Sequence, residues 1–204
     1  GTFKMWLARE GVDVKTIGFL SWVGMAYSLK FIWAPLLDRY QLTRHGRRKS
    51  WLFFTQLALI GFIALMGLFN PTTSLTPLVI TAILVAFFSA TQDSPVDAYR
   101  REFLPDEEMG LGASMTTYGY RIAMLVSGGL AIGLVGDSAL NLTWNQLYFS
   151  MAGLMGIGFI TTFFIPEPTV SEPTPKSLRD AVIEPFKEFL LRPQALLLLT
   201  FVIA

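Results

Sequence analysis

The sequence predicts an all-α transmembrane protein, and three observations carry that prediction. Of the 204 residues, 52% are hydrophobic and only 15% are charged, whereas about 25% of the residues in a soluble domain are charged. Apolar runs of about 20 residues, the length of an α-helix that crosses a bilayer, recur along the chain. These runs lack the alternation of polar and apolar residues that marks a strand of an outer-membrane barrel.

The composition also excludes several classes of protein. The chain has no Cys, which removes disulfides, thiolate catalysis and Cys-ligated metals. Its only histidine is His45, so a His-ligated metal site is not expected, and no cofactor is predicted. The formal net charge of +1 fits neither a basic nucleic-acid-binding domain nor a strongly charged disordered chain. The partner that the composition does predict is the lipid bilayer.

Five apolar runs are predicted to span the membrane, and a sixth begins near the end of the sequence. Their limits are about 16–37, 51–69, 77–98, 111–136 and 147–165, and the sixth starts at about 194. The first nine residues are typical of the end of a preceding span. We therefore expect an internal piece of a longer membrane protein. Its parts are a truncated helix bundle at 1–165, a linker at 166–193 and the start of a second bundle at 194–204.

Basic residues in the loops predict the orientation of the bundle. The segments 38–50, 99–110 and 166–193 carry eleven Lys and Arg residues, whereas the opposite segments carry three. We expect the basic side to face the cytoplasm. The linker opens with a proline-rich stretch, and 177–190 then has the pattern of an amphipathic helix lying on the cytoplasmic membrane surface. A solvent-exposed segment that packs on its neighbours is the alternative.

Four ionisable side chains lie inside predicted spans: Lys30, Asp93, Asp97 and Arg121. Each costs at least about 2.5–3.5 kcal/mol to insert, so a function or a partner is expected. Lys30, Asp93 and Arg121 lie at overlapping depths of about 9–15 Å from the basic side, and the four charges sum to zero. We expect them to face one another across a polar cavity.

This cavity is predicted to move protons and to bind substrate. Asp93 and Asp97 are four residues apart and share a helix face, and neighbouring carboxylates raise each other's affinity for protons. The predicted proton and charge relay is Asp93, Lys30 and Arg121. The predicted substrate-binding residues are Arg121, Gln92, Lys30, Tyr118 and Tyr120. A fixed ion-pair network that only holds the helices together is the alternative.

The segment after the first complete span resembles the signature loop of the major facilitator superfamily. It reads Pro35-Leu36-Leu37-Asp38-Arg39-Tyr40 and then Gly46-Arg47-Arg48-Lys49. Pro35 replaces a Gly, and the spacer before Gly46 is longer than usual. The resemblance implies the N-terminal six-helix half of a transporter whose remaining half is its partner. It also implies a conformational gate made of Asp38, Arg39, Gly46, Arg47, Arg48 and Asp97, in which Asp38 and Arg47 pair with Asp97 and the far half.

Further stretches narrow the resemblance to the AmpG-type muropeptide permeases. They are 14–19, 88–93 with 97–98, 119–121 with 124–129, and 166–169. This resemblance implies proton-driven import of sugar-peptides, the N-acetylglucosaminyl-1,6-anhydromuramyl peptides, across the bacterial inner membrane into the cytoplasm. It further implies a role in peptidoglycan recycling and, in some bacteria, in β-lactamase induction.

Other functions remain open at this point. An acetyl-coenzyme A transporter on the same scaffold shares a Gln-Asp stretch like that at 92–93, but would need a strongly basic cavity for its phosphates. A structural membrane subunit or a membrane enzyme would belong to a different class of protein. The sequence has no His pair, no Cys and no Ser-His arrangement, so no catalytic residue and no enzymatic activity are predicted.

Overall fold

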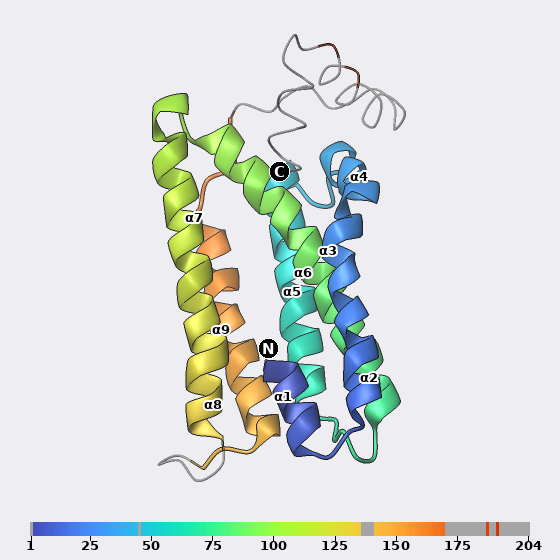
Figure 1. Cartoon of the computed structure of the whole chain (residues 1–204). Helices are drawn as coiled ribbons and strands as arrows, with labels where there is room; N and C mark the ends of the chain where they lie inside the picture. The colour runs from blue at the N-terminus through green and yellow to red at the C-terminus, as the bar shows by residue number, and fades with distance from the viewer. Residues whose placement is uncertain (1, 45, 136–140, 170–186, 188–190, 192–204) are drawn as a thin grey trace.

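The protein is helical in the residues that its computed structural model describes, which are 2–44, 46–135, 141–169, 187 and 191. These residues form one bundle whose longer helices run roughly along a common axis (Figure 1), and none of them belongs to a β-strand. Three helices in this part of the chain are long and apolar enough to cross a membrane. The all-α transmembrane prediction is therefore confirmed, and the chain is a multi-pass membrane protein.

Three of the predicted spans are continuous helices. They are α5 (Arg47–Met66), α6 (Leu75–Phe103) and α9 (Trp144–Phe164). Helix α6 continues through Pro95, whose side chain is fully buried. Helix α9 begins at a capping box, in which Thr143 and Gln146 each satisfy a backbone N–H of the other. Helix α5 packs along both α6 and α9, so it lies at the centre of this group.

The span predicted at 16–37 is helical but is not one regular α-helix. It consists of α2 (Val14–Phe19), η1 (Leu20–Gly24), α3 (Met25–Leu29), η2 (Lys30–Ile32) and α4 (Ala34–Arg39). The segments η1 and η2 are 3₁₀-helical, a winding with three residues per turn that places residues i and i+3 in line. Asp13 caps the first piece by accepting a hydrogen bond from the Lys15 N–H.

The span predicted at 111–136 is also divided. A short 3₁₀ turn, η3 (Asp106–Glu108), leads into α7 (Met109–Met124), followed by the π-helical segment η4 (Leu125–Leu130) and by α8 (Ala131–Leu134). The wider π segment contains Gly128 and Gly129. Its Ser127 carbonyl oxygen accepts a 2.6 Å hydrogen bond from the Thr2 hydroxyl, which ties it to α1 (Thr2–Arg9).

The end of the bundle opposite α4 is held together by aromatic packing (Figure 1). The Trp6 ring lies 6.2 Å from the Trp144 ring and 5.0 Å from the Tyr148 ring, measured between centroids. Leu7 and Leu78 are fully buried in the same cluster. This cluster joins α1, α6 and the start of α9.

Two predicted features fall outside the part of the chain that the structure describes. These are the amphipathic helix at 177–190, apart from position 187, and the start of the second bundle at 194–204.

Candidate functional site

Three side-chain hydrogen bonds join the divided helix of 14–39 to α6. They run from Tyr27 Oη to Ser89 Oγ at 2.7 Å, from Lys30 Nζ to Asp93 Oδ2 at 3.3 Å, and from Trp33 Nε1 to Thr91 Oγ1 at 3.0 Å. The donors Tyr27, Lys30 and Trp33 recur at every third residue. Tyr27 lies in α3, Lys30 begins the 3₁₀ segment η2 and Trp33 follows it, and residues three apart lie on the same side of such a helix.

The Lys30–Asp93 ion pair confirms that these two charges, which both lie within predicted spans, are close together. The Lys30 side chain is 35% exposed and the Asp93 side chain 45% exposed. Pairing offsets part of the cost of placing each charge within the membrane. The partial exposure keeps both groups open to protons and solutes on the unpacked side of the bundle.

Asp97 has a different partner, so the two carboxylates of α6 do not act as one site. Asp97 Oδ1 lies 3.2 Å from Arg100 Nη2, one helical turn further on, and its side chain is 57% exposed. The pairing of Asp38 and Arg47 with Asp97, which the resemblance implied, is not formed among the described residues. Glu102, which lies about one and a half helical turns after Asp97 on α6, pairs with Arg47 instead.

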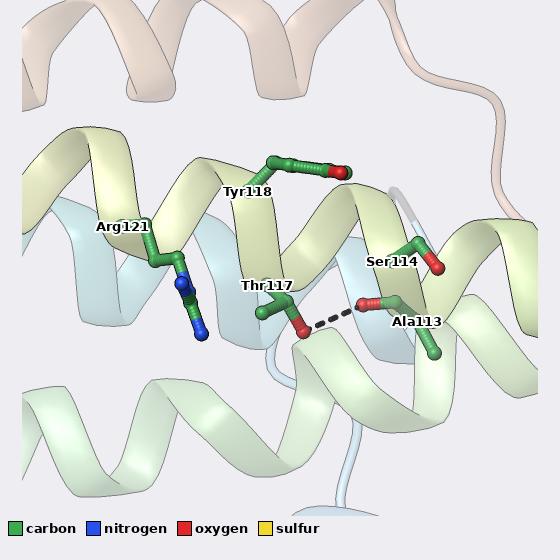
Figure 2. A pocket seen from close by; sticks show the side chains of 5 residues that line it. All are labelled: Ala113, Ser114, Thr117, Tyr118 and Arg121. Carbon is green, nitrogen blue, oxygen red and sulfur yellow. Dashed lines mark hydrogen bonds between the residues drawn. The ribbon is translucent and has the colours of Figure 1, made fainter.

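Arg121 lies apart from the Lys30–Asp93 pair. It lines an open hollow of about 410 Å³ on α7, together with Ala113, Ser114, Thr117 and Tyr118. Figure 2 shows the side chains of Arg121 and Thr117 pointing to the same side of α7. Arg121 forms no ion pair with any residue that the structure describes. The predicted contact of Arg121 with the α6 carboxylates is therefore not formed, and its guanidinium is available to an anionic group.

Tyr118 and Tyr120, both predicted to bind substrate, lie on different faces of α7. Tyr118 lines the hollow with Arg121, whereas Tyr120 does not. Two residues along an α-helix turn the side chain by about 200°, so the two rings leave opposite faces of α7. Both are well exposed, at 64% and 65%. The structure therefore brings Tyr118, but not Tyr120, to the hollow beside Arg121.

Gln92 precedes Asp93 on α6, and its side-chain oxygen is buried. Gln92 Oε1 accepts no hydrogen bond from the described residues. A buried acceptor without a donor costs about 1–3 kcal/mol. This cost makes Gln92 a candidate to bind a group from outside this part of the chain.

At the basic end of the bundle, Glu102 joins two arginines of α5. Glu102 Oε1 lies 3.2 Å from Arg47 Nη2 and 2.5 Å from Arg48 Nη2, and all three side chains are 9% exposed or less. Arg48 Nη1 also reaches Asp38 Oδ1 at 2.5 Å. Four of the six predicted gate residues thus lie in or beside this cluster, since Gly46 directly precedes Arg47. Arg39 instead lies over the Tyr40 ring, 5.7 Å from its centroid.

Glu167 closes this network from the end of α9. Its two carboxylate oxygens accept hydrogen bonds from the backbone N–H groups of Arg48 and Lys49 at 2.9 and 3.0 Å. The first N–H groups of a helix lack partners within the helix and carry partial positive charge. The carboxylate therefore caps α5, and it connects the basic loop to the segment that leaves α9.

These contacts describe two charged sites, one within the bundle and one at its basic end. Within the bundle, the half-exposed Lys30–Asp93 pair suits proton binding, and the Arg121 guanidinium, apart from it on α7, suits a carboxylate. The outer site is a network of five charges, of which Arg47, Arg48 and Glu102 are the most buried. No group of His, Cys, Asp and Glu that could hold a metal ion occurs within the described ranges.

Comparison with known proteins assigns this arrangement to a family. The profile described as Major Facilitator Superfamily matches residues 3–204. The chain belongs to the Major Facilitator Superfamily. The Asp38–Arg48 contact lies in the loop that resembles the superfamily signature.

Several relatives within the superfamily are similar along most of the chain. An "Anhydromuropeptide permease" of Escherichia coli K12 is 45% identical over 203 residues, which is 100% of this chain and 41% of the relative. An "Uncharacterized protein" of Haemophilus influenzae is 40% identical over 92% of the chain and 44% of the relative. A "Putative transporter AmpG 1" of Rickettsia conorii is 37% identical over 78% of the chain and 38% of the relative. The chain spans about two fifths of the length of these relatives.

Two residues of the network at the basic end were not among the predicted site residues. Glu102 and Glu167 are separated by 54 and 119 residues from Arg48, which they contact. Both stand in segments that the loop-charge count had placed on the basic side. Because these two segments carry seven further acidic residues, the sequence held no signal that would single out either of them.

Proposed function

We propose that the full-length transporter containing this chain imports anhydromuropeptides into the bacterial cytoplasm, coupled to proton entry across the inner membrane. The observation that carries this proposal is the half-exposed Lys30–Asp93 ion pair within the bundle. The substrate class rests on the similarity to a relative named "Anhydromuropeptide permease". In this proposal 1–165 belong to the N-terminal bundle, 166–193 link it to the other half on the cytoplasmic side, and 194–204 begin that half.

Asp93 acts in this proposal as the proton acceptor. A proton that binds the Asp93 carboxylate removes its negative charge, and the attraction that holds the Lys30 ammonium 3.3 Å away is lost. Lys30 is then free to bind a carboxylate of the peptide. Loss of the proton to the cytoplasm restores the ion pair and displaces the substrate, so proton and substrate cross together.

The hollow on α7 supplies the second part of the substrate site. Arg121 provides a planar fork of donors that fits a carboxylate, and no residue of the described chain competes for it. The hydroxyls of Ser114, Thr117 and Tyr118 line the same hollow and are suited to sugar hydroxyls. Gln92 adds a buried acceptor on α6.

The network at the basic end serves as the gate. Arg47, Arg48, Asp38 and Glu102 hold the ends of α4, α5 and α6 together. Rocking of one bundle against the other alternates access to a central site in such transporters. Asp97 and Arg39, which lie outside this network, face the other half in this proposal.

The proposal is tested by uptake of labelled anhydromuropeptide into cells that lack their own permease and express the full-length gene. We expect uptake that a protonophore abolishes. Asp93→Asn should abolish uptake while the protein remains inserted in the membrane. Asp106→Asn is the matched control, because Asp106 is exposed in η3 outside the site, and it should transport normally.

Other results would contradict distinct parts of the proposal. Normal uptake by Asp93→Asn would refute the relay role of this carboxylate. Uptake that resists the protonophore would refute proton coupling. Absence of uptake by correctly inserted wild-type protein would refute the muropeptide substrate and would direct the next assay to acyl-coenzyme A compounds.

A further inference from the structure

An apolar groove runs between α5 and α9 near the basic end of the bundle. Its volume is about 410 Å³, and its walls include Phe53, Phe54 and Leu57 of α5 and Phe159 and Phe163 of α9. The Phe53 ring lies 4.5 Å from the Phe163 ring and 5.4 Å from the Phe159 ring. These ring contacts join the two helices along one side of the groove.

The groove opens on a surface that faces the hydrocarbon of the bilayer. Leu57 is 60% exposed and Phe163 is 58% exposed. Helix α9 contains no ionisable side chain other than Tyr148, and α5 contains none after Lys49. The ion pair and the free guanidinium that could line a polar cavity lie instead on 14–39, α6 and α7. An apolar chain is therefore the natural occupant of the groove.

A positive charge stands at the mouth of the groove. The Lys49 ammonium donates to the carbonyl oxygens of Phe163 and Ile165 at 3.0 and 2.8 Å, where α9 ends, and lies 5.9 Å from the Phe53 ring centroid. An ammonium has three donors, and the described chain takes two of them. The mouth thus combines a positive charge with one remaining donor.

Arg44 adds a second positive charge beside the mouth. It follows Thr43, which lines the groove, and it is exposed and outside every ion pair of the described residues. No acidic residue lines the groove. The basic neighbours Arg47 and Arg48 are neutralised by Asp38 and Glu102. The Glu167 carboxylate, which accepts from the N–H groups of Arg48 and Lys49, is a negative charge beside this mouth. Lys49 and Arg44 outnumber it, so the mouth keeps an excess of one positive charge.

The mouth lies at the depth of lipid head groups. Trp51 Nε1 donates to the Tyr40 carbonyl oxygen at 2.7 Å, and Trp and Tyr side chains concentrate at the membrane interface. From Ser50 to Leu57 the groove descends about 10 Å along α5, into the hydrocarbon region. An amphiphile with an anionic head and an acyl chain matches both ends of the groove.

We propose that this groove binds an anionic phospholipid of the leaflet at the basic end of the bundle. One acyl chain lies between α5 and α9 against the phenylalanines, and the phosphate lies beside Lys49 and Arg44. The site is separate from the Lys30–Asp93 pair and from the hollow on α7, and it does not depend on the identity of the transported substrate.

The test uses the full-length protein in nanodiscs that contain a trace of photoactivatable lipid. Two probes carry the same diazirine-labelled acyl chain, one on phosphatidylglycerol and one on phosphatidylcholine. We expect phosphatidylglycerol to label the peptides that contain 53–57 and 159–163, and phosphatidylcholine to label them several-fold less. Equal labelling by both probes would overturn the proposal, because the groove would then hold bulk lipid without regard to charge.

Two kinds of variant separate the acyl chain from the head group. Leu57→Trp fills the groove from an exposed position and should abolish labelling by either probe, whereas Phe164→Trp, an 82% exposed neighbour outside the groove, should not. Arg44→Gln combined with Lys49→Gln should lower phosphatidylglycerol labelling to the phosphatidylcholine level, whereas Arg101→Gln should leave it unchanged. Labelling that persists in Leu57→Trp, or headgroup preference that persists without both cations, would overturn the site.

Discussion

The carboxylate of Glu167 lies directly against Gly46, where the end of α9 meets the start of α5. Gly46 has φ 105° and ψ 164°, a backbone conformation that is essentially restricted to glycine. Glu167 then binds the N–H groups of Arg48 and Lys49. The glycine of the signature loop is thus required twice, for its backbone angles and for the space that the carboxylate occupies.

Replacing Gly46 with Ala should destabilise the transporter. The backbone conformation alone costs about 1–3 kcal/mol for a residue with a Cβ, and the new methyl group would displace Glu167 from the helix terminus. Loss of a helix cap costs about 0.5–2 kcal/mol in addition. The measurement is the thermal unfolding midpoint of the purified full-length protein in detergent, which should fall.

The matched control is Gly61→Ala in the interior of α5. A Cβ at Gly61 meets no atom within 4 Å, and its backbone is helical. Alanine favours a helix over glycine by about 0.8–1 kcal/mol, so this variant should unfold at the same temperature or higher. Equal midpoints for the two variants would show that the Gly46–Glu167 contact does not contribute to stability.

Glu102→Gln should be among the most destabilising single changes at the basic end. Glu102 accepts from both Arg47 and Arg48, and the side chains involved are 8–9% exposed. Removing one partner of a buried ion pair costs about 3–5 kcal/mol, because the remaining charge stays buried without compensation. Glu107→Gln, at an exposed position in η3, should change stability by no more than about 0.5 kcal/mol. A similar small change for Glu102→Gln would mean that water or another group satisfies the two arginines.

The sequence predicted the spans well because apolar composition alone determines which segments enter a membrane. The long helices α5, α6 and α9 begin within four residues of the limits predicted at 51, 77 and 147. The divided winding of 14–39 could not be predicted in this way. Its contacts to α6 include three hydrogen bonds whose partners lie about 60 residues further along the chain, and apolar composition does not report such contacts.

Prediction of the site was limited by the same long-range contacts. The pairing of Lys30 with Asp93 followed from their similar depth and opposite charge. Depth does not show toward which side of its helix a residue points, however. Arg121 was therefore expected beside them, although it lies on a separate surface of α7. Glu102 and Glu167 lie outside the hydrophobic runs, where a charge costs little to place, so their contacts with the start of α5 were not apparent.

A double variant should distinguish a proton relay from an ion pair that only holds two helices together. Lys30→Gln and Asp93→Asn should each lower the unfolding midpoint, since each leaves one charge within the bundle unpaired. The double variant Lys30→Gln/Asp93→Asn removes both charges and should recover most of that stability. If Asp93 carries the proton, the double variant should still be inactive in protonophore-sensitive uptake. Recovery of uptake together with stability would show that the pair is structural.

Tyr118→Phe and Tyr120→Phe form a matched pair that tests the hollow on α7. Both rings are about equally exposed, at 64% and 65%, but only Tyr118 lines the hollow with Arg121. A single hydrogen bond contributes about 1 kcal/mol, so loss of the Tyr118 hydroxyl should raise the KM for muropeptide uptake about fivefold. The Tyr120 hydroxyl leaves the opposite face of the helix, and its removal should leave KM unchanged. If both variants raise KM equally, the substrate contacts both faces of α7, and the hollow beside Arg121 is not its binding site.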